Sequence, residues 1–371
     1  MTEGKLRVGV IFGGRSGEYE VSLMSARSVL SVLDPQKFDV TQIGITHEGY
    51  WLTGENVLEA LEKEETGRLQ NAGLLPDPKY TGIVTIHETE HGLQMKLLSQ
   101  LDVVFPVLHG TFGEDGTLQG LLEMAGIAYV GAGVLGSSVG MDKGVFQAVM
   151  QAHHIPVIKT IVLLRSELTE HMDAIIGRAE EMSEYPIFVK PANLGSSVGV
   201  SKCLNRADLL EGLLEAARYD RRILVQHGVN GREIEVSVLG NDAPEASVPG
   251  EILPSREFYS YEAKYLDNAS ELLIPAPIPA ATAEMARDLA VRAFKAIDCQ
   301  GMARVDFLLD KDSGELFLNE LNTIPGFTSI SMYPKLWEEC GLPYPKLVNR
   351  LIELALERKA ENQKTEHRYT G

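Results

Sequence analysis

The sequence has 371 residues, which is enough for two or three domains. Hydrophobic residues make up 44% and charged residues 23%, as is typical of globular proteins. The formal net charge of -18 argues against a general nucleic-acid binder, and no apolar run approaches the roughly 20 residues of a membrane span. The start carries no apolar signal-peptide core, and the three cysteines are scattered. We therefore expect a cytoplasmic protein without disulfides.

The first third of the chain alternates between apolar strand patterns and helical spacing. We expect strands over 6–12, 38–46 and 101–108 and helices over 21–33 and 117–125. This alternation predicts an α/β unit with a doubly wound parallel sheet, in which ligands bind beyond the carboxyl ends of the strands. Gly13-Gly14 and His109-Gly110 lie at two such ends. Residues 47–100 are polar and acidic, and we interpret them as a solvated insertion.

Two further units follow, with boundaries that we place at 142–232 and 233–371. In the second unit we expect helices over 145–151, after 164 to about 181 and over 209–218, and strands over 157–164, 185–190, 200–202 and 223–226. The third unit opens with residues 233–239, which alternate between polar and apolar like an antiparallel strand. Residues 1–141 then form the N-terminal domain.

Gly131, Gly133 and Gly136 match the GxGxxG pattern of a dinucleotide-binding turn. The pattern follows an apolar run and precedes helix-compatible sequence, as such a turn requires. However, it comes deep in the chain, and no acidic residue ends the next strand. A structural glycine turn is the better interpretation, and a nicotinamide-dependent oxidoreductase remains the alternative.

Lys190 closes an apolar strand shortly before the sequence Gly195-Ser196-Ser197-Val198-Gly199. Backbone N–H groups of a glycine-serine turn can hold phosphate oxygens, and a neighbouring lysine adds positive charge. Because strands flank the turn, it would form a flap between hairpin arms. A plain flexible hairpin turn is an equally good interpretation from these residues alone, and a non-catalytic nucleotide-binding module would also use Lys190.

Four polar residues occupy alternate positions of two expected strands near the carboxyl end. Arg304 and Asp306 share one strand face, and Glu320 and Asn322 share another. Carboxylate and amide oxygens suit Mg²⁺, and an arginine beside them could neutralise a phosphoryl group or an oxyanion. A solvated polar sheet face is the alternative. The Pro-Gly turn at Gly326 could offer N–H groups to the same oxyanion.

Taken together, these motifs resemble those of the D-alanine–D-alanine ligases, members of the ATP-grasp superfamily. The resemblance runs through essentially the whole chain. It rests on residues 13–22, 109–116, 141–143, 190–199, 259–265, 304–306 and 320–326. It implies an ATP-grasp fold with an N-terminal parallel-sheet domain, and ligation of two D-alanines to D-alanyl-D-alanine via an acyl phosphate. The product would serve bacterial peptidoglycan synthesis.

The resemblance also implies roles for individual residues. ATP would be held by Lys143, Lys190, Ser197, Gln226, His227, Val229 and Glu233. Two Mg²⁺ ions, for which Mn²⁺ can substitute, would be bound by Asp306, Glu320 and Asn322. The catalytic set would be Glu18, Ser196, Tyr265, Arg304 and Gly326, and the substrates would also contact His109, Lys264, Ser331 and Met332. A homodimer that binds neither nucleic acid nor membrane is implied as well.

Within this family the acceptor remains open between D-alanine, D-lactate and D-serine. In the family, a tyrosine directly after the lysine that Lys264 matches accompanies peptide-forming ligases, and a phenylalanine there accompanies depsipeptide-forming ones. This chain has Lys264-Tyr265, so the resemblance implies D-alanine as the acceptor. Gln226 stands where the family often has glutamate, which affects only the expected nucleotide preference.

Overall fold

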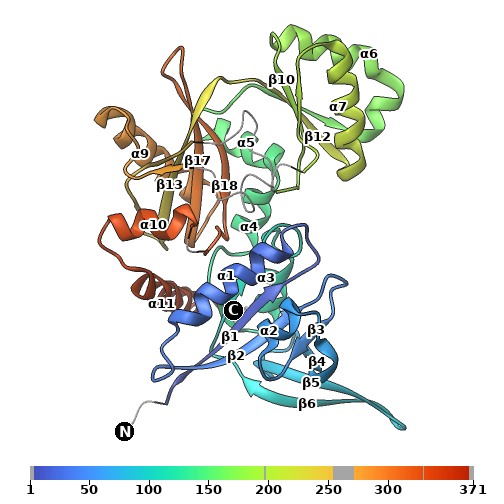
Figure 1. Ribbon diagram of the computed structural model, residues 1–371, viewed down its shortest axis with the longest axis vertical. Helices are drawn as coiled ribbons and strands as arrows, with labels where there is room; N and C mark the ends of the chain where they lie inside the picture. The colour runs from blue at the N-terminus through green and yellow to red at the C-terminus, as the bar shows by residue number, and fades with distance from the viewer. Residues whose placement is uncertain (1–3, 196–197, 254–270, 329, 367–371) are drawn as a thin grey trace.

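The computed structural model describes residues 4–195, 198–253, 271–328 and 330–366, and these residues form three β-sheets with helices packed on them (Figure 1). The sheets follow one another along the chain. The eight-stranded sheet ends at Tyr129, the four-stranded sheet spans 160–227, and the six-stranded sheet spans 231–322. Within the described residues, no helix has the length and apolar character needed to cross a membrane.

The N-terminal sheet has the strand order β6-β5-β4-β3-β2-β1-β7-β8. Its strands are β1 (Leu6–Gly13), β2 (Phe38–Ile45), β3 (Trp51–Thr53), β4 (Gln70–Leu74), β5 (Gly82–Thr89), β6 (Gly92–Gln100), β7 (Val103–Val107) and β8 (Ala128–Tyr129). The accompanying helices are α1 (Tyr19–Val32), α2 (Val57–Glu62), the short 3₁₀ helix η1 (Thr66–Arg68) and α3 (Thr117–Met124).

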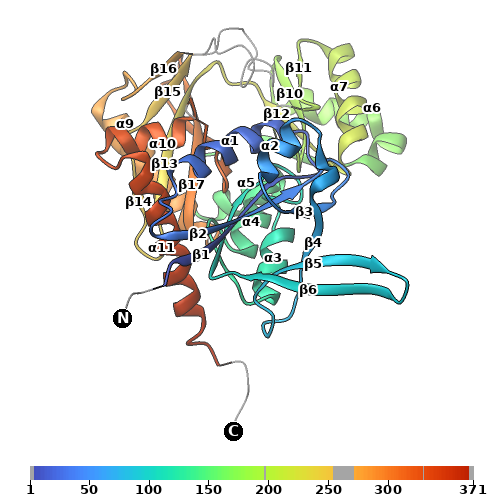
Figure 2. The same cartoon turned by 60° about the horizontal axis from the view of Figure 1, so that its bottom comes forward.

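This sheet is mixed rather than wholly parallel. Strands β2, β1, β7 and β8 pair in parallel, as the alternating sequence predicts, and the apolar strand β7 is buried along its whole length. The interpretation of residues 47–100 as a solvated insertion is wrong, because they form strands β3 to β6, which extend the sheet in antiparallel pairing. Strand β6 is an almost fully exposed edge strand although it carries Leu93, Met95, Leu97 and Leu98, and the β5–β6 hairpin projects from the body (Figure 2).

The second sheet is wholly antiparallel, with the order β11-β10-β12-β9. It is reached through α4 (Val134–Met141) and α5 (Lys143–Ala152). The unit comprises β9 (Thr160–Leu164), α6 (Arg165–Met182), β10 (Ile187–Pro191), β11 (Ser201–Cys203), α7 (Arg206–Tyr219) and β12 (Arg222–His227). The strand predicted from residue 157 starts only at Thr160, since Val157 makes an isolated bridge to Leu318 of the third sheet instead.

The third sheet has the order β16-β15-β13-β17-β18, with β14 paired to β13. Its elements are β13 (Gly231–Gly240), β14 (Glu245–Ala246), β15 (Gly250–Leu253), β16 (Glu271–Leu273), α9 (Ala280–Ala296), β17 (Gly301–Asp310), β18 (Leu316–Asn322), α10 (Met332–Glu339) and α11 (Tyr344–Asn362). The predicted hairpin of residues 304–322 is present as β17 and β18. Apolar residues of α9 pack against β13, β17 and β18 in one core.

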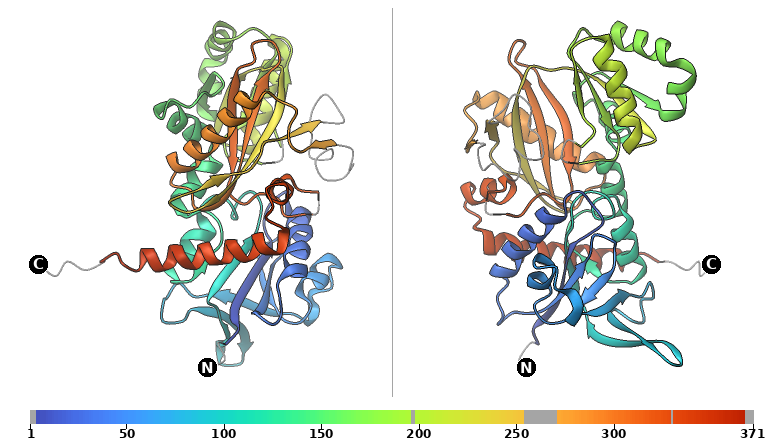
Figure 3. Two further views of the ribbon diagram at one scale, coloured as in Figure 1. Left: turned by 90° about the vertical axis from the view of Figure 1, so that its left-hand side faces the viewer. Right: turned by 45° about the vertical axis from the view of Figure 1, so that its right-hand side comes forward.

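Helix α11 belongs to the third unit by sequence but packs against the first. Leu347 and Leu351 are fully buried in the same core as Val8 and Phe105 of the N-terminal sheet. Figure 3 shows α11 crossing beside this sheet, below the other two lobes. The loop that leads from β18 to α10 also sends Phe327 into this core. This shared core therefore holds the N-terminal and C-terminal parts of the chain together near the carboxyl end of β18.

Arg358 fixes α11 to the N-terminal sheet. It is buried, it donates hydrogen bonds to the carbonyl oxygens of Gly131 and Tyr129, and its guanidinium lies 4.1 Å from the centre of the Tyr129 ring. Arg358→Met should lower the free energy of unfolding by about 2–4 kcal/mol, because two buried carbonyls lose their partner. Arg350→Met on the same helix, where the ion pairs are exposed, should cost less than about 1 kcal/mol. Denaturant titration of both variants checks this, and equal losses would contradict it.

Candidate active site

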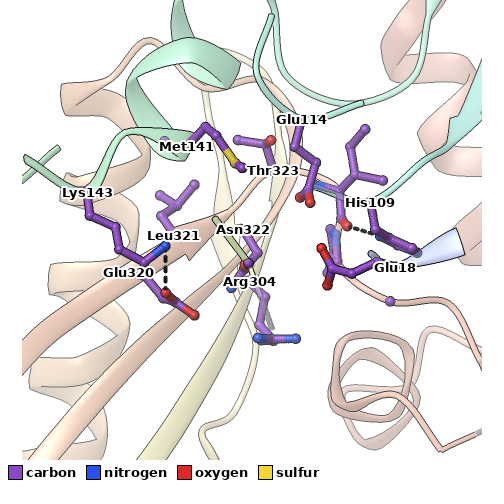
Figure 4. Close-up of a pocket in the computed structure, with 15 residues that line it drawn as sticks. Glu18, His109, Glu114, Met141, Lys143, Arg304, Glu320, Leu321, Asn322 and Thr323 are labelled. Atoms are coloured by element: carbon purple, nitrogen blue, oxygen red, sulfur yellow. Dashed lines mark hydrogen bonds and ion pairs between the residues drawn. The ribbon is translucent and has the colours of Figure 1, made fainter. Parts of the chain in front are cut away.

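A pocket lies where the N-terminal sheet, helix α4 and the β17–β18 hairpin meet (Figure 4). Seven of the predicted site residues line it: Glu18, His109, Lys143, Arg304, Glu320, Asn322 and Gly326. The remaining lining residues are Glu114, Gly140, Met141, Gly195, Leu321, Thr323, Ile324 and Pro325. Residues that are distant in sequence are thus brought together at one cleft between lobes.

The polar face of the β17–β18 hairpin forms one wall of this pocket. In the strand register Arg304 lies opposite Asn322, and Asp306 lies opposite Glu320. Val305 and Phe307 point to the apolar core, so the intervening polar residues share the other face, as predicted.

Asp306 is held firmly on this face. It accepts two hydrogen bonds from Arg304, at 2.7 Å from Nε and 2.6 Å from Nη2, and a third from Asn322 Nδ2 at 2.9 Å. Arg304 also forms an ion pair with Glu235 of β13, at 3.1 Å between Nε and Oε2. Because a bidentate arginine–carboxylate pair fixes both planes, the positive group is aimed at a defined place beside the carboxylates.

The donor set on this hairpin fits a magnesium ion that is completed by substrate. Asp306 and Glu320 supply carboxylate oxygens on paired strands, and Asn322 supplies an amide oxygen. Across the part of the chain that the structure describes, no cluster of three His, Cys, Asp or Glu side chains could hold a metal by itself. Mg²⁺ is commonly bound through only one or two carboxylates together with substrate phosphates, so a small protein set is what such a site requires.

Two lysines of the second unit have their side chains directed toward the β17–β18 hairpin. Lys143 Nζ donates to the carbonyl oxygen of Leu194 at 2.8 Å and lies 3.7 Å from Glu320 Oε2. Lys190 Nζ donates to Asn319 Oδ1 at 3.5 Å. Asp142 caps helix α5, accepting from the amides of Gly144 and Val145, and so fixes the position of the neighbouring Lys143. The lysines place positive charge between the glycine-rich turn and the hairpin.

Glu18 lies between two glycines that belong to different lobes. A Cβ atom at Gly110 would come within 2.8 Å of Glu18 Oε2, and one at Gly195 within 2.7 Å. Gly110 also has a positive φ of +72°, so an L side chain there would be strained as well as crowded. The carboxylate of Glu18, the loop after β7 and the start of the glycine-serine turn therefore approach one another closely.

His109 uses both ring nitrogens within the protein. Its Nδ1 lies 3.0 Å from the carbonyl oxygen of Ile324, which can only accept, so Nδ1 carries the proton. Its Nε2 lies 3.2 Å from Ser25 Oγ and accepts from that hydroxyl. Full burial lowers the pKa of His109 and favours this neutral form. The ring therefore ties the N-terminal unit to the loop after β18.

Glu114 accepts hydrogen bonds at both carboxylate oxygens. Gly110 N–H donates to Oε2 at 2.8 Å, and Ile324 N–H donates to Oε1 at 3.1 Å. Burial, and next the charge of Glu18, raise the pKa of Glu114 to about 8, although its hydrogen bonds and Arg304 act in the opposite direction. Sequence reasoning placed Glu114 inside a motif but gave it no role.

The start of α10 lies next to Gly326. Ser331 precedes the helix, and its Oγ accepts from the N–H of Thr328 at 2.9 Å. A Cβ atom at Gly326 would lie 3.0 Å from this oxygen. The Met332 side chain is buried in an apolar cluster with Ile252 and Leu336, so a polar ligand could meet Met332 only through its backbone.

Four of the predicted ATP-binding residues lie at the junction of the second and third sheets. Gln226 is buried within β12, between β10 and β9, and donates from Nε2 to Thr160 Oγ1 at 3.1 Å. His227 Nδ1 lies 2.6 Å from Ser183 Oγ. Val229 lies in the connection to β13, and Glu233 follows within β13, opposite Leu308 of β17.

Four predicted site residues lie outside the described residues, namely Ser196, Ser197, Lys264 and Tyr265. The GxGxxG pattern begins after β8, where Gly131 has a φ of +95°, and ends at Gly136 within α4. A Cβ atom at Gly136 would meet the Cys299 backbone at 3.2 Å, so this glycine allows the third unit to approach closely. Tight packing thus accounts for Gly136, as the interpretation of a structural turn expects.

Sequence reasoning missed three residues of this region. Glu235 is buried beside Arg304, and the signal for it was present: it lies two positions after Glu233, on the same face of an alternating strand. Asn319 bonds Lys190 from a position just before the predicted metal ligands. Glu114 carried no comparable pattern, because its two partners are backbone amides 4 and 210 residues away.

Two family models match the chain and together span most of it. The model described as D-ala D-ala ligase N-terminus matches residues 7–132, and the model described as D-ala D-ala ligase C-terminus matches residues 149–353. Among curated proteins, the D-alanine--D-alanine ligase of Heliobacterium modesticaldum is 51% identical over 360 residues, covering 97% of each chain. That of Natranaerobius thermophilus is 50% identical, with the same coverage.

Solved structures give the same result in three dimensions. A D-alanine-D-alanine ligase from Coxiella burnetii superposes with a TM-score of 0.81 at 36% identity, covering 98% of this chain and 97% of that one. VanG D-Ala:D-Ser ligase from Enterococcus faecalis superposes with a TM-score of 0.84 at 35% identity, covering 95% and 100%. Ligases that differ in the acceptor thus share this arrangement of lobes.

Proposed function

The chain belongs to the D-alanine–D-alanine ligase family, and we propose that its pocket joins two D-alanines with ATP through an acyl phosphate. It has the ATP-grasp fold of these ligases. The observation that carries the proposal is the convergence, in one pocket, of Glu18 with the Arg304 and Glu320 face of the hairpin and with Lys143. An ammonium anchor, a phosphoryl site and an oxyanion site are the three parts that such a ligation requires.

The reaction needs activation because a carboxylate has a poor leaving group. A carboxylate oxygen of the first D-alanine attacks the γ-phosphorus of ATP, and ADP leaves, giving an acyl phosphate. The amine of the second D-alanine, in its neutral form, then attacks the carbonyl carbon. The tetrahedral oxyanion collapses, the bond to phosphate breaks, and the amine nitrogen loses a proton as the amide forms. Phosphoryl transfer of this kind depends mainly on positioning and charge neutralisation.

The residues of the pocket supply those two requirements. Lys143 and Lys190 would neutralise the phosphates of ATP, and Arg304 with the N–H of Gly326 would face the developing oxyanion. Adenine and ribose would lie against the stretch of Gln226, His227, Val229 and Glu233. Asp306, Glu320 and Asn322 would hold two Mg²⁺ ions, or Mn²⁺ in their place. When bound, these ions draw charge from the phosphoryl oxygens.

Water must be excluded, since an acyl phosphate hydrolyses. We propose that the glycine-serine turn and the segment 256–267 act as lids, with Ser196 and Tyr265 linked to Glu18, and that Lys264, Ser331 and Met332 receive the second carboxylate. His109 would face the first substrate through the pocket side of its ring.

We also propose three domains, 1–141, 142–232 and 233–371, in a cytoplasmic homodimer with no nucleic-acid or membrane partner.

Glu18→Gln should impair use of the first D-alanine while leaving nucleotide binding nearly unchanged. A charge-assisted bond to the ammonium group is the strongest polar contact available at this position, and its loss should raise the KM for D-alanine about 10- to 100-fold. Glu20→Gln, an exposed position in the first turn of the helix that Glu18 precedes, is the matched control and should behave as the parent. Steady-state kinetics together with ADP titration checks this; equal losses in ADP and D-alanine affinity would remove the assigned role.

One incubation tests the proposed function directly. The chain is mixed with ATP, Mg²⁺ and D-alanine, and both phosphate and dipeptide are measured, with L-alanine, D-serine and D-lactate as alternative substrates. We expect equal amounts of phosphate and D-alanyl-D-alanine, and little product from D-lactate at neutral pH. Preferential joining of D-alanine to D-serine or D-lactate would overturn the acceptor assignment, and absence of any D-alanine-dependent phosphate release would overturn the function.

A further inference from the structure

The loop after β18 carries the proposed oxyanion donor, and the N-terminal unit holds this loop by its backbone. Glu114 accepts from the N–H of Ile324, and His109 donates to the carbonyl oxygen of the same residue. Three residues later, the N–H of Phe327 donates to Ser25 Oγ at 3.2 Å. Side chains from the first 114 residues thus fix both ends of a four-residue segment more than 200 positions away.

The segment between these anchors leaves one backbone donor for a ligand. Residue 325 is proline and has no N–H, so Gly326 carries the only backbone N–H between those of Ile324 and Phe327. Gly326 and Ile324 line the pocket, and the side chains of Ile324 and Phe327 are buried in the N-terminal core. The direction in which the Gly326 N–H points is therefore set by how its two neighbours are anchored.

We propose that Glu114 is a positioning residue that aims the Gly326 N–H at the oxyanion, by clamping the backbone of Ile324 to that of Gly110. The proposal rests on the proposed function for its kinetic consequence. Glu114 does not need to touch a substrate for this role, because it acts through Ile324. Its two oxygens accept from two N–H donors at 2.8 and 3.1 Å, so one side chain ties Gly110 to Ile324.

The clamp also lies in the electrostatic field of the first substrate's site. Glu18 and Glu114 both face the pocket (Figure 4), and repulsion between them is one cause of the raised pKa of Glu114. An ammonium group bound at Glu18 would offset that repulsion and favour the ionised form of Glu114, which accepts both hydrogen bonds more strongly. Binding of the first substrate and alignment of the oxyanion donor are thereby linked.

Glu114→Gln is the direct test, since the amide keeps the shape but can accept at only one end. We expect kcat for dipeptide formation to fall about 10- to 100-fold, because a misaligned donor loses transition-state stabilisation. The KM for ATP should stay within about threefold of the parent. Amide hydrogen exchange over residues 322–328 should accelerate. Glu123→Gln, which alters a carboxylate that accepts from Tyr129 in the same unit, is the matched control and should change none of these quantities.

The outcomes separate the clamp from a general structural role. A folded Glu114→Gln variant with parental kcat overturns the proposal, as does a variant in which kcat, ATP affinity and thermal stability fall together. If that variant does not fold, Ser25→Ala removes the second anchor, and parental kcat there overturns the proposal equally. If the parent chain makes no dipeptide, the proposed function fails, whereas the exchange comparison still tests the clamp.

Discussion

Glu320→Gln should reduce the rate of dipeptide formation at least about 100-fold while the protein remains folded. Glu320 lies opposite Asp306 on the paired strands and 3.7 Å from Lys143, with its side chain partly exposed to the pocket. The substitution keeps the size and removes one negative charge from the proposed metal ligands, which weakens charge neutralisation at the transferring phosphoryl group. Turnover is measured at saturating ATP and Mg²⁺, so that weaker binding alone cannot explain a loss.

Glu315→Gln is the matched control for this experiment. Glu315 is exposed beside the turn of the same hairpin, and its backbone carbonyl, which the substitution leaves in place, accepts from Asp310. We expect its turnover to stay within a factor of two of the parent. If Glu320→Gln unfolds at the parental temperature and also retains near-parental turnover, Glu320 is not a metal ligand.

Arg304→Lys should lower turnover by about 100-fold or more, although the positive charge is kept. Arg304 holds Asp306 through two hydrogen bonds of 2.7 and 2.6 Å and also pairs with the buried Glu235. An ammonium group cannot reproduce this planar fork, so Asp306 loses its fixed orientation and the oxyanion loses a directed donor. Steady-state kcat and the Mg²⁺ dependence of the rate are the measurements.

The chain offers a closely matched control in Arg232→Lys. Arg232 bonds Glu251 through a similar fork, at 2.7 and 2.6 Å, on the same sheet but away from the pocket lining. Both variants should lose similar stability, since each breaks a bidentate pair, but only Arg304→Lys should lose activity. A comparable loss of turnover in Arg232→Lys would mean that the effect comes from the sheet rather than from the site.

Elements governed by local pattern were predictable from the sequence. The alternation of Val305 and Phe307 with Arg304 and Asp306 placed the polar face of β17 correctly, because side-chain direction in a strand follows a period of two. The apolar run of β7 likewise identified a buried strand. The motif order then identified the family, which the comparisons establish.

Features set by distant partners were not predictable in this way. Residues 47–100 form strands β3 to β6, and in β6 the alternating Leu93, Met95 and Leu97 remain exposed, so this apolar alternation does not mark a buried face. The burial of α11 against the N-terminal sheet depends on contacts between Leu351 and residues some 250 to 340 positions earlier. The hydrogen bonds that hold Ile324 use its backbone N–H and carbonyl groups. Every non-proline residue carries these groups, so no pattern of side chains in the sequence predicts this contact.

The most direct test of the acyl phosphate route follows a carboxylate oxygen of D-alanine into the released phosphate. D-Alanine labelled with ¹⁸O in its carboxylate is incubated with ATP, Mg²⁺ and the full chain, and the released phosphate is analysed by mass spectrometry. If the carboxylate attacks the γ-phosphorus and the acyl phosphate is then cleaved by the second amine, each phosphate formed carries one ¹⁸O atom, in step with each D-alanyl-D-alanine. Dipeptide formed together with unlabelled phosphate would contradict the acyl phosphate route and the roles given to Arg304, Glu320 and Gly326.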